Sequence, residues 1–176
     1  MSINGILLNR KAIFMNEIVF STCKINGQVE DLNLSNYFSA QERAKYAHFR
    51  LTRRKVSYVC GRLAGKYAVT LFYPTKKMKE IEIENGNFHE PFISSSSRTP
   101  AVISLAHSGR IGVALSSQKV NPIGIDIEKE SSDYANKIKL ILDDGEKKIL
   151  CADQLEILAW TAKEALGKAL KTGLNT

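Results

Sequence analysis

Two carboxylates lie two positions apart in the stretch NPIGIDIEKE, residues 121–130. They are Asp126 and Glu128, and isoleucines alternate with them, which is the pattern of a β-strand. Because side chains alternate across a strand, both acids would share one face, and Gly124 on that face would allow another group to approach the backbone closely. Carboxylate oxygens suit Mg²⁺, which takes few carboxylates and completes its shell with water and substrate phosphates. The alternative is an exposed edge strand whose acids are simply solvated.

A second candidate group lies in QLEILAWTAKEALGKALKTG, residues 154–173, which we predict to be helical over 153–172. Glu164 and Lys168 are four residues apart and would point in the same direction, on a face that also carries Trp160. They could supply a third carboxylate and a lysine to the same metal and phosphate, or form an ordinary surface ion pair of little energetic value. An apolar stripe is predicted beside them, formed by Leu155, Leu158, Ala162, Ala165 and Ala169.

The rest of the chain must position these groups. Ser39 and Glu42 form a capping box, which predicts that a helix begins there, and a long basic helix is expected from Arg53 to Phe72, ended by Pro74. Strands are predicted at 12–20, at 81–84 and on either side of 107–109, a polar loop at 92–100, and a further helix at 133–142.

The chain also contains an internal similarity. SAQE (39–42) precedes GRLAGK (61–66), and DDGE (143–146) precedes EALGK (164–168), so each half has a helix-cap signature followed by a Gly-Lys pair. The pattern indicates two duplicated lobes, 1–116 and 117–176, although chance similarity between short helical segments would look the same.

Composition limits the classes of protein. The chain has 176 residues, 44% of them hydrophobic, and 25 Lys and Arg against 18 Asp and Glu, a net charge of +7. The surplus predicts an acidic partner, such as a polyphosphate ligand, an acidic protein or nucleic acid. Three cysteines without a CxxC pair predict free thiols in a reducing compartment, and no signal peptide or membrane span is predicted. We therefore expect a cytoplasmic protein.

GIDIE (124–128) followed by WTAKEALGK (160–168) resembles the two signature motifs of phosphopantetheinyl transferases, in their order and separation. The resemblance is closest to the larger, pseudo-dimeric type that activates surfactin synthetase. ISLAHSGR (103–110) is similar to the Ser-His-Ser-Gly segment of that family, and QERAKYAHF (41–49) to its N-terminal basic helix. Larger members continue past the last helix with strands of the second lobe, so that lobe is expected to be partial here.

The resemblance implies an α+β fold of two similar lobes, each a small antiparallel sheet packed with a long helix. It also implies the transfer of 4′-phosphopantetheine from coenzyme A to a serine of an apo acyl or peptidyl carrier protein, releasing adenosine 3′,5′-bisphosphate. Mg²⁺ would be the metal, with Mn²⁺ as an alternative ion. The partners would be coenzyme A and the carrier protein, with no membrane and no nucleic acid.

Site residues follow from the same resemblance. The metal would be held by three carboxylates, Asp126, Glu128 and Glu164, of which Glu164 or Glu128 would also accept the serine proton. Lys168 would neutralise the attacked phosphate. Three further side chains would contact the cofactor, Lys45, His107 and Lys163. The simpler alternatives are a histidine without a ligand role at 107 and a solvated helix lysine at 45.

Two rival functions fit parts of the pattern. A metal-dependent nuclease also pairs strand carboxylates with a lysine, but has no use for the helix motif WTAKE. A basic nucleic-acid-binding module would explain the aromatic residues in the basic helix, but no recognised RNA-binding motif or zinc spacing is present.

Overall fold

The computed structural model describes residues 2–3, 5–13, 17–87, 90–94, 101–131, 136, 138, 140, 142–150 and 155–172. The strands are β1 (Ser2–Ile3), β2 (Ile6–Ile13), β3 (Ile18–Ile25), β4 (Glu82–Asn85), β5 (Pro91–Ser94), β6 (Val102–Ser108) and β7 (Ile111–Ser117). The α-helices are α1 (Ala40–Ala47), α2 (Thr52–Val69), α4 (Asp144–Ile149) and α5 (Leu155–Leu170). Short 3₁₀ turns occur at Val29–Asp31, Leu34–Asn36 and Met78–Glu80. No helix in these ranges is long and apolar enough to span a bilayer.

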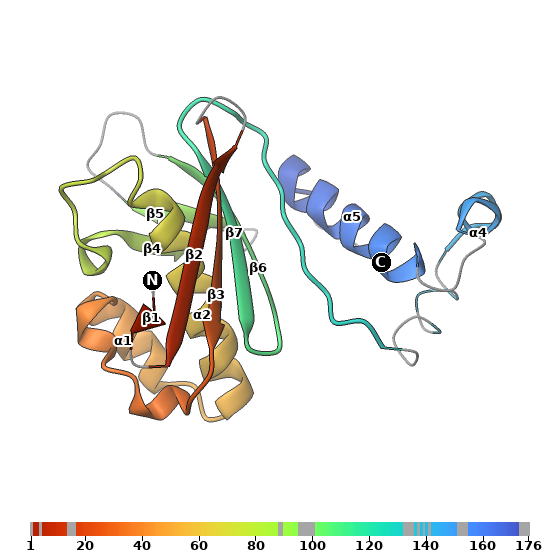
Figure 1. Cartoon of the computed structure of the whole chain (residues 1–176). Helices are drawn as coiled ribbons and strands as arrows, with labels where there is room; N and C mark the ends of the chain where they lie inside the picture. The colour runs from red at the N-terminus through yellow and green to blue at the C-terminus, as the bar shows by residue number, and fades with distance from the viewer. Residues whose placement is uncertain are drawn as a thin grey trace.

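An antiparallel sheet of five strands, in the order β1-β2-β3-β7-β6, forms the centre of the first part of the chain (Figure 1). In β3, every second side chain is buried, from Val19 to Ile25, as expected for a strand with one face on the core. The long helix α2 packs on that face, burying Val59 and Leu63 completely. The sheet and α2 therefore form one hydrophobic core.

Gly112 in β7 explains how closely α2 approaches the sheet. A Cβ atom at this position would lie 2.3 Å from the carbonyl of Cys60 in α2, which no side chain allows. The Ser21 hydroxyl in β3 donates to the carbonyl oxygen of Ala64 at 2.5 Å and fixes the same contact. Cys23 and Cys60 are buried there as free thiols.

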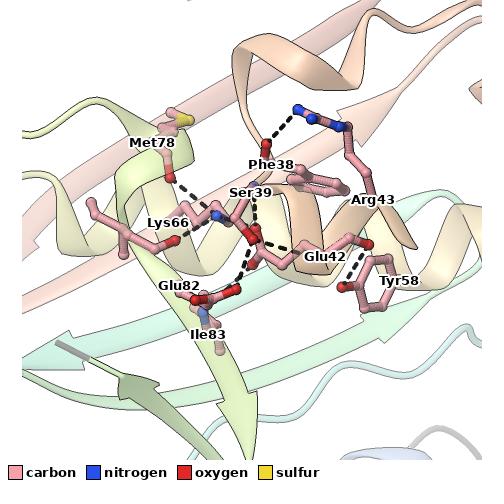
Figure 2. Close-up of polar contacts among 10 residues, drawn as sticks. Phe38, Ser39, Glu42, Arg43, Tyr58, Lys66, Met78, Glu82 and Ile83 are labelled. Atoms are coloured by element: carbon pink, nitrogen blue, oxygen red, sulfur yellow. Dashed lines mark hydrogen bonds and ion pairs between the residues drawn. The ribbon is translucent and has the colours of Figure 1, made fainter. Parts of the chain in front are cut away.

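A buried ion pair joins α1 to α2 (Figure 2). Lys66 of α2 is 0% exposed, and its Nζ lies 2.5 Å from the carboxylate of Glu42. Lys66 also donates to the carbonyl oxygens of Met78 and Ile81, so three acceptors surround it. Burial lowers the pKa of Lys66, and Glu42 counteracts that shift. The lysine predicted as half of a Gly-Lys repeat is thus a structural residue in this lobe.

Most predicted elements of the first lobe are confirmed. Ser39 caps α1, and its reciprocal capping box with Glu42 is present. The basic helix and the two strands around 107–109 occur as α2, β6 and β7, and the strand at 81–84 occurs as β4. These segments have strong local signals, which explains the agreement.

Two predictions in the first lobe are wrong. Residues 12–20 are not one strand, because β2 ends at Ile13 and β3 begins at Ile18, its antiparallel partner. Hydrophobic runs on both sides of a reversal look continuous in sequence. The predicted loop at 92–100 begins inside β5, which pairs with β4, and its remaining residues 95–100 lie outside the described ranges.

The second part of the chain contains helices. Asp143 caps α4 with the capping box that the sequence predicts. Of the helix expected at 133–142, positions 136, 138 and 140 are helical, and 142 is not. Ile138, Leu142 and Ile157 form a small core against Trp160.

The predicted apolar stripe of α5 is wrong for Leu155, Leu158 and Ala162, which are exposed, whereas Ala165 and Ala169 are half-buried and face Gly124. Leu158 is 62% exposed and Leu155 is 37% exposed, whereas Ile157 is buried. The stripe was placed by periodicity alone, but α5 packs through Ile157 and through the small residues that face the segment after β7. Among the described residues after Ser117 there is no strand (Figure 1).

The expected fold class, a mixed α+β chain with an antiparallel sheet and a long helix packed on it, is confirmed. The lobe boundaries at 1–116 and 117–176 stay a prediction.

Candidate functional site

The segment that carries Asp126 and Glu128 is extended but is not the predicted strand. Across residues 121–131 it pairs with no strand of the described chain. The amide of Ile125 donates to the hydroxyl of Ser104 on the edge strand β6 at 3.1 Å. Figure 1 shows the segment after β7 running between the sheet and α5.

Gly124 brings this segment onto α5. A Cβ atom there would lie 1.9 Å from the carbonyl oxygen of Ala165 and 2.9 Å from the amide nitrogen of Ala169. Only glycine permits this contact between two backbones. The close approach that the sequence predicted at Gly124 is therefore made by the helix itself, and it sets the next acid beside α5.

Asp126 and Lys168 meet as a result. The Nζ atom of Lys168 lies 2.5 Å from Oδ1 of Asp126, and the two side chains are 33% and 8% exposed. The second oxygen, Oδ2, is buried and has no hydrogen-bond partner among the described atoms. A buried carboxylate oxygen without a partner is unfavourable, and such an atom calls for an explanation, such as an ion.

A cleft of about 590 Å³ lies next to this ion pair. One wall is the edge strand β6, including Ser104, and the other is α5, with Glu164 and Lys168, and with Lys171 directly after the helix. The cleft therefore combines an apolar wall with two lysines and two carboxylates, Glu90 and Glu164, and its lysines could bind an anionic group while its apolar wall takes a longer uncharged part.

A smaller cavity of about 260 Å³ contains a residue that the sequence reasoning missed, Arg62 of α2. Its Nη2 donates to Oδ1 of Asn85, its guanidinium lies 5.5 Å from the centre of the Tyr58 ring, and its buried Nη1 has no partner within the described ranges. One signal was available, since Arg62 interrupts the apolar run of α2 on its buried side.

His107 lines the same small cavity at the end of β6. Partial burial lowers the pKa of His107, and the positive charge of Lys168 lowers it further. The opposing effects of Lys168 and Asp126 on this pKa indicate that His107 lies in the field of the Asp126–Lys168 pair. The two cavities thus flank one charged centre.

The structure gathers some predicted site residues and not others. Glu164 and Lys168 line the larger cleft, His107 lines the smaller cavity, and Asp126 lines neither but pairs with Lys168. Lys45 is exposed on α1, and neither cavity includes it, Glu128 or Lys163 in its lining. Lys163 instead forms an ion pair with Glu146, and its hydrogen bond lowers the pKa of that carboxyl.

The carboxylates near this ion pair could hold a metal ion only with the help of other ligands. In the described part of the chain, no three His, Cys, Asp or Glu side chains lie close enough together to hold an ion. Mg²⁺ nevertheless requires only one or two carboxylates when substrate phosphates complete its shell. The buried Oδ2 of Asp126, which has no partner among the described atoms, fits that requirement.

Comparison with protein families finds a match over the part of the chain that contains Asp126 and Lys168. The family model of the 4′-phosphopantetheinyl transferase superfamily matches residues 122–176, which contain Asp126 and α5. No curated protein sequence matches the chain.

Among solved structures, the chain is similar to the crystal structure of a holo-(acyl-carrier-protein) synthase from Bacillus anthracis str. Ames in complex with CoA (3′,5′-ADP). The sequence identity is 20% and the TM-score is 0.51, over 57% of this chain and 92% of that chain. At this identity the likeness shows a shared fold.

Proposed function

We propose that the chain is a phosphopantetheinyl transferase, of the larger pseudo-dimeric type, that acts on an apo acyl or peptidyl carrier protein. The observation that carries this proposal is the Asp126–Lys168 pair at a cleft whose wall includes Glu164. The matched family model covers the same residues and supports the same reaction class. Coenzyme A is the proposed substrate, because its pyrophosphate and its long uncharged arm suit the two parts of the cleft.

In the proposed reaction, the serine oxygen of the carrier protein bonds to the phosphorus that bears the pantetheine arm. The bond from that phosphorus to the bridging oxygen breaks, and adenosine 3′,5′-bisphosphate leaves. Glu164, which lines the cleft, is the proposed acceptor of the serine proton, with Glu128 as the alternative. Lys168 offsets negative charge that develops on the phosphoryl oxygens.

Asp126 is the proposed first ligand of Mg²⁺, with Glu128 and Glu164 as the further ligands that the resemblance implies. When bound, the ion would stabilise charge on the phosphates and orient the leaving group. His107 and Arg62 are proposed to bind a phosphate of the adenosine part, because they line one cavity and Arg62 has a free buried Nη1. Lys45 and Lys163 are proposed to contact the cofactor on the resemblance alone.

The test is incubation of the chain with coenzyme A, Mg²⁺ and an apo carrier protein, followed by mass spectrometry of the carrier. One phosphopantetheine should be added to its serine. Asp126→Ala and Glu164→Ala should abolish the product, while Lys119→Ala, at an exposed ion pair with Glu17, should leave it unchanged. Unmodified serine on several carriers, with a folded enzyme, would overturn the proposal.

A further inference from the structure

The two oxygens of Asp126 are in different situations. Oδ1 accepts from Lys168, whereas Oδ2 is buried without a partner among the described atoms. We infer that Lys168 holds the place of the metal in the unliganded protein, so that a divalent cation binds Asp126 well only after an anionic ligand has drawn Lys168 away. This inference rests on the proposed function, because it concerns the order of events at the same site.

The charges explain why the lysine and the metal exclude each other. An ammonium group on Oδ1 and a divalent ion on Oδ2 would share one carboxylate, of which only 8% is exposed. Two cations a few ångströms apart repel strongly where water is largely excluded. The metal affinity of Asp126 should therefore be low as long as Lys168 remains paired with it.

Lys168 is able to leave, in contrast to the lysine of the first lobe. Lys66 is fully enclosed by Glu42 and two carbonyl oxygens. Lys168 is 33% exposed, and its single hydrogen-bond acceptor in the described chain is Asp126. It lines the large cleft near Lys171, where a diphosphate would offer several charged oxygens. A lysine on a flexible stem can exchange one carboxylate for such oxygens at small cost.

The exchange makes ligand and metal depend on each other. A diphosphate that takes Lys168 uncovers Asp126, and a metal at Asp126 pushes Lys168 toward the phosphate. Because linkage is reciprocal, coenzyme A should raise the affinity for metal by the same factor by which metal raises the affinity for coenzyme A. Lys168 is the residue through which this coupling would pass.

The first experiment titrates the protein with Mn²⁺ alone, without nucleotide, and follows free Mn²⁺ by electron paramagnetic resonance. Lys168→Met should bind Mn²⁺ roughly tenfold more tightly than the wild type, within the usual range of coupling between sites. Lys168→Gln serves as a second neutral variant in case the first folds poorly. Lys171→Met is the matched control, since it removes the same charge from the same cleft, and it should change the affinity less than about twofold.

The result that overturns the inference is an Mn²⁺ affinity of both Lys168 variants equal to that of wild type or of Lys171→Met. Adding Asp126→Asn to Lys168→Met should remove the gained affinity, and persistence of that gain would also overturn it. A second titration measures coenzyme A binding with and without Mn²⁺. In the wild type, Mn²⁺ should raise the affinity for coenzyme A strongly, and in Lys168→Met this effect should nearly disappear. If coenzyme A does not bind at all, the proposed function fails, while the Mn²⁺ titration still decides the exchange.

Discussion

Helices α2 and α5 each carry a lysine directly after a glycine, and the two lysines meet different surroundings. Lys66 is sealed between α1, α2 and the 3₁₀ turn before β4, with Glu42 at 2.5 Å (Figure 2). Lys168 is at the same distance from Asp126 but remains one-third exposed at a cleft. Four residues earlier, α2 carries Arg62 and α5 carries Glu164. Similar helices therefore carry an enclosed lysine in the first part of the chain and a partly exposed lysine in the second part.

The cap glutamates extend the comparison. Glu42 and Glu146 each hold the third position of a capping box, and each pairs with a lysine of the long helix that follows. In the first lobe that lysine is Lys66, whereas in the second it is Lys163, five positions before the Gly-Lys lysine. Because Glu146 pairs with Lys163, Lys168 is left to Asp126. The two cap glutamates therefore pair with lysines at different positions of the helix, and in α5 the Gly-Lys lysine, Lys168, is not the partner of the cap glutamate.

The largest expected effect is on the sealed lysine. Lys66→Met leaves the Glu42 carboxylate buried without its counter-charge, so the free energy of unfolding should fall by about 3–5 kcal/mol. Urea denaturation measures it. Lys119→Met, at an exposed pair with Glu17, is the control and should change the free energy by less than about 1 kcal/mol. Equal effects of the two would remove the distinction between sealed and open lysines.

The second expectation concerns catalysis. Lys168→Met should lower kcat of the proposed transfer by about a hundredfold, because the charge on the attacked phosphate is no longer offset. Its stability loss should be smaller than that of Lys66→Met, since Lys168 is partly solvated. Steady-state kinetics and urea denaturation on the same samples separate the two quantities. If Lys168→Met lost as much stability as Lys66→Met and kept its kcat, Lys168 would be a structural residue and not a catalytic one.

Close backbone contacts provide a third comparison. Gly112→Ala and Gly124→Ala both introduce a Cβ against a helix backbone, of α2 and α5 respectively. Each should destabilise its contact by about 1–3 kcal/mol. Hydrogen exchange should show loosening across the sheet for Gly112→Ala, and around α5 alone for Gly124→Ala. Gly27→Ala, where a Cβ meets nothing within 4 Å, is the control, and a matching loss there would contradict the reading.

The smallest expected effect is that of Arg62 on the binding of coenzyme A. Arg62→Met should weaken coenzyme A binding roughly tenfold, the order expected for one charged hydrogen bond. Calorimetric titration measures the dissociation constant, with Arg43→Met as the control, since Arg43 is exposed and bonds to the carbonyl oxygen of Phe38. Unchanged affinity in Arg62→Met would restrict phosphate binding to His107 and the lysines.

Local signals predicted much of this molecule. The capping boxes at Ser39 and Asp143 and the helix α2 follow from residue types at fixed short spacings. The sequence predicts that the two motifs share one site, and the structure has an ion pair between Asp126 of the first and Lys168 of the second. The roles assigned to these two residues stay a prediction. The sequence could not predict the tertiary contacts. The 121–131 segment looks like a strand, but it packs on α5 through Gly124, and no local pattern reveals which partner a segment will find.

Arg62 and Leu158 illustrate the same limit in opposite directions. An arginine in an apolar helix has a visible signal, yet only the fold shows that its Nη1 is buried beside His107. Leu158 fits an apolar stripe, yet it is 62% exposed, because periodicity gives the faces of a helix and not which face is covered.

The contact at Gly124 affects the order in which the parts of the molecule unfold on heating. The acid-bearing segment packs on α5 and belongs to no sheet of the described chain, whereas the strands of the sheet are joined by ladders and covered by α2. Regions with few buried contacts open at lower free energy than the core. On warming, the proposed transferase activity should therefore be lost while the sheet is still folded, and it should return on cooling. The protein would have two melting points, and the lower one would limit the proposed reaction.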